Sequence, residues 1–214
     1  MTSPSSAAQR LQRLTDTVLD MCVTSLAVVM IAPAAVADED EGDRFEGRRG
    51  TVGLAYVYGE SDFDHEPGSG MHIDQADGGT FWMTYRFNQW IASQARGTYL
   101  NGFEIRFNGN DRGTQIGQAT LGARLFPFAP LTAAIDDRVE LFLDMSLGLS
   151  HVDRQLGGSS KRKKWGVVSR FGGGADFWIT DAIGIELSGF YNLAIGQIVD
   201  YSNYGGTAGL TTRF

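Results

Sequence analysis

The feature that most constrains this chain is a strict alternation of apolar and non-apolar residues between Val139 and Ser150. Its apolar positions are Val139, Leu141, Leu143, Met145, Leu147 and Leu149. The positions between them are polar or small, with Phe142 as the exception. Because successive side chains of a strand point to opposite faces of a sheet, this period of two predicts one long β-strand with an apolar face.

The same period recurs in other segments after residue 50, and no helical stripe of apolar residues interrupts them. These segments cover 52–59, 80–87, 91–99, 120–125, 170–177, 183–192 and 204–214. Together with 139–150 they predict an all-β domain of eight strands that occupies residues 50–214. The chain contains 28 glycines and 5 prolines in 214 residues without a G-X-Y period, which excludes a collagen-like fold.

The N-terminus resembles an export signal. Arg10 and Arg13 precede an apolar run over 21–36, and the run ends in the small-residue motif Ala35-Val36-Ala37. This order predicts a signal peptide over residues 1–37, cleaved after Ala37. A membrane anchor is the alternative, but the run is short for a transmembrane helix and contains Pro33. Residues 38–49 are charged and lack periodicity, and we expect a short, disordered periplasmic lead-in there.

The face opposite the apolar one carries charges of both signs. Its arginines are Arg86, Arg96, Arg124, Arg170 and Arg213, and its acids are Glu140, Asp144, Asp176 and Glu186. A soluble exported barrel such as a lipocalin would expose these groups to water. A membrane barrel would enclose them as a structural ionic network in its lumen, because unpaired buried charges are costly.

The connections between segments favour the membrane barrel. They are short after Phe87 and Trp178 but long over 61–77, 101–112, 152–163 and 194–203. Short turns at one rim and long loops at the other are typical of outer-membrane barrels, as are interfacial aromatic belts. The belt expected at the short-turn rim contains Phe87, Trp90, Phe126, Phe128, Phe177, Trp178 and Phe214. The sequence therefore predicts an eight-stranded antiparallel transmembrane β-barrel, although the connection over 127–138 is long for a periplasmic turn.

On these segments, the Ala35-Val36-Ala37 signal end and the closing run from Tyr204 to Phe214, the chain resembles the small outer-membrane β-barrel proteins of Gram-negative bacteria. This is the OmpA/OmpX-like and opacity-protein-like group. The resemblance implies a place in the outer membrane, among lipid and lipopolysaccharide. It also implies that the barrel-assembly machinery reads Phe214 as an assembly signal during biogenesis. It specifies no activity.

We find no convincing catalytic site, cofactor site or metal site. Ser150, His151 and Asp153 invite comparison with a Ser/His/acid arrangement, but neighbouring strand residues such as Ser150 and His151 face opposite ways. His65 and His72 lie in the expected outer loop over 60–77, which holds six acids and no Lys or Arg. Such a loop could bind a hard cation such as Ca²⁺, or it could simply be solvated.

A basic run forms part of the expected outer loop over 152–163 and the start of the next segment. It consists of Lys161, Arg162, Lys163 and Lys164, followed by Trp165. At an outer rim these cations could bind lipopolysaccharide phosphates. They could instead pair with the acidic loop, or be solvated.

These observations predict a non-enzymatic, monomeric barrel whose loops serve surface interaction or envelope integrity. A small-conductance or solute-specific channel is the main alternative, and a lipid A-modifying enzyme is another. An eight-stranded barrel is just wide enough for side chains to fill it, so we expect no wide channel. The net charge of −7 argues against nucleic-acid binding. Glycines are expected inside, where they would leave room for Arg and Glu side chains: Gly53, Gly59, Gly122, Gly148, Gly172, Gly174, Gly184, Gly205 and Gly209.

Overall fold

The computed structural model describes residues 49–61, 72–73, 75–107, 110–129, 138–155 and 161–214. All of them belong to one compact unit within 42–214, and the predicted signal peptide lies outside the described residues. The strands are β1 (Gly50–Ser61), β2 (His72–Ile73), β3 (Ala76–Arg86), β4 (Ile91–Phe107), β5 (Asn110–Leu125), β6 (Val139–Gln155), β7 (Lys161–Trp178), β8 (Ile183–Ile195) and β9 (Asn203–Arg213). A 3₁₀ segment, η2 (Gly196–Tyr201), joins β8 to β9.

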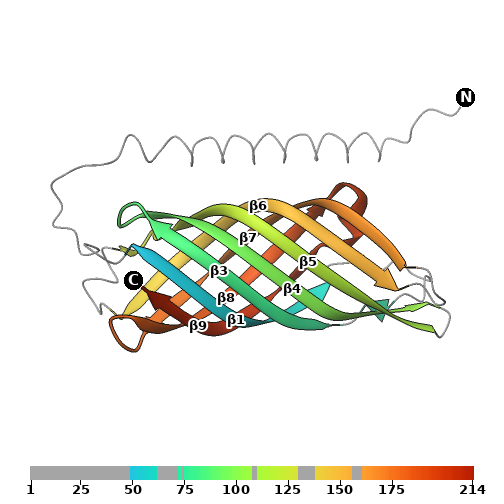
Figure 1. The fold of residues 1–214 in the computed structure, drawn as a ribbon, viewed down its shortest axis with the longest axis horizontal. Coiled ribbons are helices and arrows are strands. Elements are labelled where there is room, and N and C mark those ends of the chain that lie inside the picture. Colours follow the sequence, from blue (N-terminus) through green and yellow to red (C-terminus); the bar gives the residue numbers. More distant parts are fainter. Residues whose placement is uncertain (1–48, 62–71, 74, 108–109, 130–137, 156–160) are drawn as a thin grey trace, which may run out of the picture. The chain divides into compact units, whose positions relative to one another are not determined.

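The eight long strands form a closed antiparallel barrel, which confirms the predicted fold class (Figure 1). Each pairs with its neighbours in the sheet, β4 pairs with β5, and β1 pairs with the last strand, β9. At this last seam Gly50 and Phe214 exchange backbone hydrogen bonds, with N···O distances of 3.0 and 2.9 Å. The two-residue strand β2 adds to the edge of β4 near its end. Because the sheet closes on itself, its long strands leave no open sheet edge in the barrel wall. Backbone N–H and C=O groups in lipid need such pairing, because no water is there to bond them.

Two expected loops are shorter than predicted, because strands occupy much of them. β6 continues to Gln155 and β7 begins at Lys161, where 152–163 was predicted to be a loop. In the same way β4 extends to Phe107 and β5 begins at Asn110. The ends of β6 and β7 are charged on both faces, because neither face needs to be apolar once a strand leaves the hydrocarbon. In β4 the alternation continues over 103–107, but a register shift between Asn101 and Phe103 separates it from the earlier positions. The barrel therefore has two long hairpins, β4–β5 and β6–β7, at the end opposite the C-terminus (Figure 1).

The distribution of apolar and charged residues is the reverse of that in a water-soluble protein. Leu54, Leu121 and Leu210 project outward with 64–67% of their surface exposed. Inside the barrel, Arg124 and Glu186 are almost fully buried. A soluble barrel would bury the leucines and expose the charges. The soluble alternative is therefore wrong, because the charged face lines the interior. Among the described residues, no helix is long and apolar enough to cross a bilayer.

Aromatic side chains form belts at both ends of the outer surface. At the short-turn end Trp90, Phe128, Phe177 and Phe214 are exposed, as predicted. Phe126 and Trp178 are buried inside instead, so their assignment to the belt was wrong. Phe126 lies two residues after the inward Arg124, and Trp178 lies two residues after the inward Asp176. Residues two apart on a strand face the same side. The opposite belt was not predicted, and its exposed members include Tyr56, Tyr99, Trp165 and Tyr204.

The inward glycines make room mainly for aromatic rings and for close strand approach. The Trp82 ring occupies the space that a Cβ on Gly53 would need, and Trp178 lies against Gly184. At Gly122, Gly148, Gly174 and Gly209 the added Cβ would meet backbone of a neighbouring strand. The expectation that glycine makes room for Arg and Glu side chains was therefore wrong at these positions. Because these glycines have no Cβ, the neighbouring strands can pack closely against them.

Candidate functional site: the charged interior of the barrel

The interior holds an ionic cluster that five different strands supply. Arg96 comes from β4, Arg124 from β5, Asp144 from β6, Asp176 from β7 and Glu186 from β8. All five side chains are buried. Their positions follow from register, because Arg124 lies opposite Asp144 and Asp176 lies opposite Glu186. The last pair places two like charges side by side, and a cation must reach between them.

Arg124 is that cation. Its Nε lies 2.9 Å from Asp144 Oδ1, its Nη1 lies 3.3 Å from Asp176 Oδ2, and its Nη2 lies 2.8 Å from Glu186 Oε2. The planar guanidinium presents five N–H donors in a rigid fork, so one arginine can serve three acids. Arg124 is therefore the centre of the cluster.

Two further arginines complete the pairing of the acids. Arg96 Nη2 lies 3.2 Å from Asp144 Oδ2 and 3.5 Å from Glu186 Oε1. Closer to the short-turn end, Arg86 Nη1 lies 3.0 Å from Glu140 Oε1. The structure thus brings together seven of the nine predicted lumen charges: Arg86, Arg96, Arg124, Glu140, Asp144, Asp176 and Glu186.

Arg170 and Arg213 stand apart from these ion pairs. Arg213 Nε donates to the backbone oxygen of Asp181 at 2.6 Å. Arg170 is 2% exposed and has no ion pair or hydrogen bond with any described residue that uses its Nε or Nη1. Arg170 of β7 is therefore a buried lumen charge that lies outside the ion-pair cluster.

Every one of the five lumen arginines also lies over an aromatic ring, a feature that sequence reasoning missed. The pairs, with guanidinium carbon to ring-centroid distances, are Arg86–Phe126 (3.7 Å), Arg96–Trp82 (5.1 Å), Arg124–Phe142 (3.7 Å), Arg170–Phe190 (3.9 Å) and Arg213–Trp178 (4.2 Å). A cation over a ring face is attracted by the ring's quadrupole, most strongly where water is absent. The alternation of the sequence could have placed these rings inside the barrel. Each ring lies two residues along the chain from a polar or charged residue that faces inward, and such residues share a face.

Away from the short-turn end, the interior changes from ionic to neutral and then to apolar. Asn192 Nδ2 donates to Gln118 Oε1 at 3.2 Å and to Asn203 Oδ1 at 2.9 Å. Beyond these amides lies an apolar cluster: Val57, Ala76, Leu100, Phe103, Ile116, Val152, Phe190, Ala194, Ile198 and Tyr201. Ile198 and Tyr201 belong to η2, so the connection over 194–203, expected to be a polar outer loop, contributes buried apolar side chains.

The predicted basic run lies at the start of a strand, and its two described side chains face opposite sides. Lys161, Arg162, Lys163 and Lys164 are the first four residues of β7. Lys164 Nζ lies 5.8 Å from the Tyr201 ring centroid and is partly buried, whereas Lys163 is exposed. The side chains of Lys161 and Arg162 lie outside what the structure describes. The two described cations, Lys163 and Lys164, therefore face opposite sides of β7.

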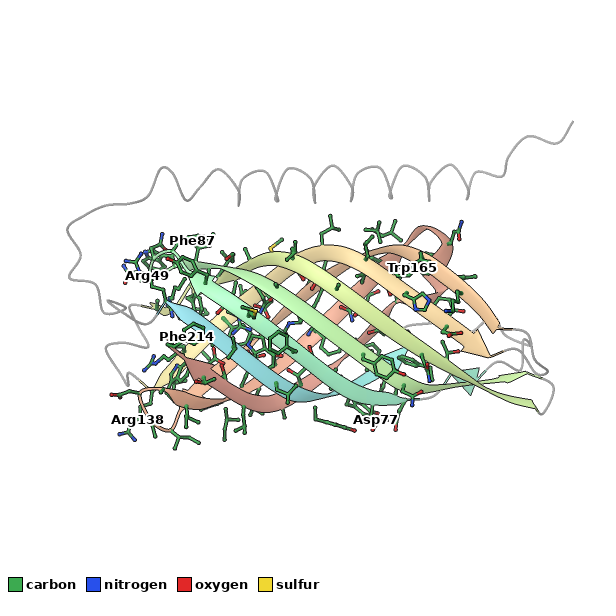
Figure 2. The ribbon with its side chains drawn as sticks, viewed as in Figure 1. Arg49, Asp77, Phe87, Arg138, Trp165 and Phe214 are labelled. Carbon is green, nitrogen blue, oxygen red and sulfur yellow. The ribbon has the colours of Figure 1, made fainter. Side chains whose placement is uncertain are left out.

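His151 projects outward beside Trp165, with ring centroids 4.6 Å apart. Figure 2 shows Trp165 toward the end of the barrel away from Arg49, Phe87, Arg138 and Phe214. Ser150 is buried on the opposite face of β6, so the two residues form no dyad. His65 and most of the acidic loop lie outside the described residues. Within the described part of the chain, no group of three or more His, Cys, Asp or Glu residues is placed to hold a metal ion.

Comparison with known proteins identifies the family. Residues 24–214 match the outer membrane protein beta-barrel domain. The chain belongs to this family. This membership and the barrel fold mean that the protein is a transmembrane β-barrel of the outer membrane. No curated protein matches the sequence significantly.

Solved structures similar to this outer membrane barrel share its fold at low sequence identity. Neisserial surface protein A is 15% identical with a TM-score of 0.51, over 77% of this chain and 96% of the other. Ail of Yersinia pestis, in complex with the heparin analogue sucrose octasulfate, is 14% identical with a TM-score of 0.50, over 78% and 99%. OprG of Pseudomonas aeruginosa is 11% identical with a TM-score of 0.50, over 77% and 95%.

Proposed function

We propose that this outer membrane barrel is a non-enzymatic, non-conducting membrane anchor that presents its two long hairpins for surface interaction. The observation that carries the proposal is the successive filling of the lumen. The Arg124 ionic cluster fills one level, and the apolar cluster with Ile198 of η2 fills another. An ion crossing the barrel would have to displace both. A filled interior is the usual state of an eight-stranded barrel.

The unequal strand lengths support a role for the hairpins. β1 has 12 residues, whereas β6 has 17 and β7 has 18. At roughly 3.3 Å per residue and a tilt of about 40°, the longer strands reach about 10–15 Å higher along the membrane normal than β1 does. β1 alone spans about 30 Å, which matches the hydrocarbon core. The ends of β4–β5 and β6–β7 therefore lie above the lipid, where a partner can reach them.

Lys163 and Trp165 suggest lipopolysaccharide as one contact of the outer rim. Both face outward from β7, Lys163 is exposed, and the Trp165 ring lies against the His151 ring, tilted by 46°, at the level of the outer aromatic belt. An ammonium next to an interfacial indole suits the phosphate groups of a lipid headgroup layer. The proposed contact therefore involves Lys163 among the four predicted cations, with Lys164 turned inward toward Tyr201.

Planar-bilayer recording of the purified, refolded barrel tests the proposal. We expect no unitary conductance in the native protein. A matched variant, Ile198→Gly, removes a fully buried side chain from the apolar cluster and keeps the ionic cluster intact. We expect this variant to show no unitary conductance either, because the intact ionic cluster alone still closes the lumen. Reproducible ion-selective openings of the native protein would contradict the proposal and favour the small-conductance channel.

A further inference from the structure

Three of the five lumen arginines pair with acids, and one buried arginine is left without an ion pair to a described residue. The lumen face contains Arg86, Arg96, Arg124, Arg170 and Arg213 against Glu140, Asp144, Asp176 and Glu186. All four acids are engaged by Arg86, Arg96 or Arg124. Arg213 lies at the short-turn end, partly exposed, and donates to a backbone oxygen, so Arg170 is the buried arginine that pairs with no described acid.

Arg170 is buried and has no ion pair with a described residue. It is 2% exposed, and its Nε and Nη1 have no hydrogen-bond partner among the described residues. The Phe190 ring, 3.9 Å from the guanidinium carbon, covers the face of the guanidinium and cannot satisfy these two N–H groups. A buried, unpaired charge is among the most destabilising features a fold can contain.

Further unpartnered donors lie on neighbouring strands. Arg96 Nε and Nη1 have no partner, and neither do the hydroxyls of Thr120 and Ser146. Register places Arg96 opposite Thr120 on β4–β5, and Ser146 opposite Arg170 on β6–β7. Thr120 lies opposite Gly148, two residues from Ser146 on the same inward face. These four side chains therefore form a continuous inward strip across β4, β5, β6 and β7.

The electrostatics of this strip favour an anion. Each end of the strip carries a guanidinium, Arg96 on β4 and Arg170 on β7, and a guanidinium can only donate hydrogen bonds. The acids Asp144 and Glu186 are already shared between Arg96 and Arg124. A water molecule accepts at most two hydrogen bonds, which is fewer than the unpartnered donors of this strip. One monovalent anion can accept hydrogen bonds from all four side chains.

We propose that a small monovalent inorganic anion, of the size of chloride or bromide, binds inside the barrel between Arg96 and Arg170. Thr120 and Ser146 supply hydroxyl donors to it. The site is enclosed by the ionic and apolar levels, so the anion enters as the barrel folds. It stabilises the folded state and does not depend on what the hairpins bind.

Refolding of the whole chain into detergent micelles tests this site. The protein is refolded from urea in sodium chloride, sodium bromide or sodium gluconate at equal ionic strength, and urea unfolding is followed by tryptophan fluorescence. An anion that binds only the folded state raises the folded-to-unfolded ratio by 1 + [anion]/Kd, roughly tenfold at ten times Kd. We expect chloride and bromide to raise the urea midpoint above that in gluconate.

Variants separate this site from a general salt effect. Arg170→Gln removes the buried guanidinium that has no ion pair with a described residue and is expected to abolish the difference between the salts, whereas Arg170→Lys retains it. Arg213→Gln, which removes a lumen arginine outside the strip, is the matched control and should keep the difference. Equal midpoints of the native protein in all three salts would overturn the proposal. The same response in Arg170→Gln as in the native protein would also overturn it.

Bromide also allows a direct test that does not depend on any variant folding. In crystals of the native barrel grown in bromide, we expect an anomalous peak within hydrogen-bond distance of Arg96 and Arg170. Density at that place without anomalous signal would identify water and refute the anion site.

Discussion

At the scale of single residues, Arg124 is the side chain on which the most interior contacts depend, because it pairs with Asp144, Asp176 and Glu186 at once. Replacing it by Met, as Arg124→Met, keeps a side chain of similar length but leaves these acids short of a cation. Breaking a buried ion pair from one side costs about 3–5 kcal/mol. We expect a loss of at least that size in the free energy of unfolding, measured by urea titration in micelles.

Lys163→Met is the control for Arg124→Met, since it removes an exposed cation from β7 and should change stability by less than about 0.5 kcal/mol. Adding Asp176→Asn to Arg124→Met removes one of the orphaned acids and should recover part of the loss. Equal stability of Arg124→Met and the native barrel would mean that the cluster contributes little.

Two glycines offer a matched test of which face is crowded. A Cβ on Gly53 would collide with the buried Trp82 ring, whereas a Cβ on Gly97 meets nothing within 4 Å. We therefore expect Gly53→Ala to lower the free energy of unfolding by about 1–3 kcal/mol through overpacking. Gly97→Ala should be neutral or stabilising by up to about 1 kcal/mol. The same urea titration measures both, and equal effects would contradict the inward placement of Trp82.

At the scale of the strand, depth in the membrane determines the cost of a charge. Leu143 projects from β6 into lipid, and Ile179 lies in the short turn after β7 with a similar exposed fraction, 50% against 58%. Arginine on the lipid face costs about 2–4 kcal/mol near the midplane and about 0–1 kcal/mol near an interface. Leu143→Arg should therefore destabilise the barrel in lipid vesicles far more than Ile179→Arg. Equal costs for the two variants would contradict the assigned lipid face.

Sequence alternation predicted the strands well only where one face meets lipid. Within the hydrocarbon, residues such as Leu54 and Leu121 must be apolar, so the period of two is visible. Beyond it, the ends of β6 and β7 are polar on both faces, and their pairing depends on register that the sequence does not display. The buried Ile198 of η2 was missed for a different reason. It is apolar because of tertiary packing inside the barrel, and no local period marks it.

The candidate site was predictable in part for a similar reason. All nine lumen charges lie on the face that alternation assigned to them, so their placement followed from parity. The ion-pair partners of these charges could not be predicted in the same way. Arg124 pairs with acids on β6, β7 and β8, and only closure of the barrel brings these strands around one axis. Arg170 shows the limit most clearly. That five cations face four anions is visible in the sequence, but that Nε and Nη1 of Arg170 have no partner among the described residues depends on the packed interior.

At the scale of the whole molecule, the C-terminal residue lies at the seam where β1 pairs with β9 and closes the barrel. The backbone of Phe214 pairs with Gly50, whereas its ring is exposed on the outer surface and lies against Gly50. The backbone bonds do not require the ring. If Phe214 is an assembly signal, as the family resemblance implies, we expect its ring to matter more for a step before closure than for the finished barrel.

Phe214→Leu separates these two roles, because leucine keeps an apolar contact with lipid but has no ring. We expect the purified variant to refold into micelles with a free energy of unfolding within about 1.5 kcal/mol of the native value. In cells we expect its amount in the outer-membrane fraction to fall several-fold, read from the mobility difference between unboiled and boiled samples. Phe214→Tyr, which retains a ring, should assemble normally. If Phe214→Leu reached native levels in the membrane, the terminal ring would serve packing alone.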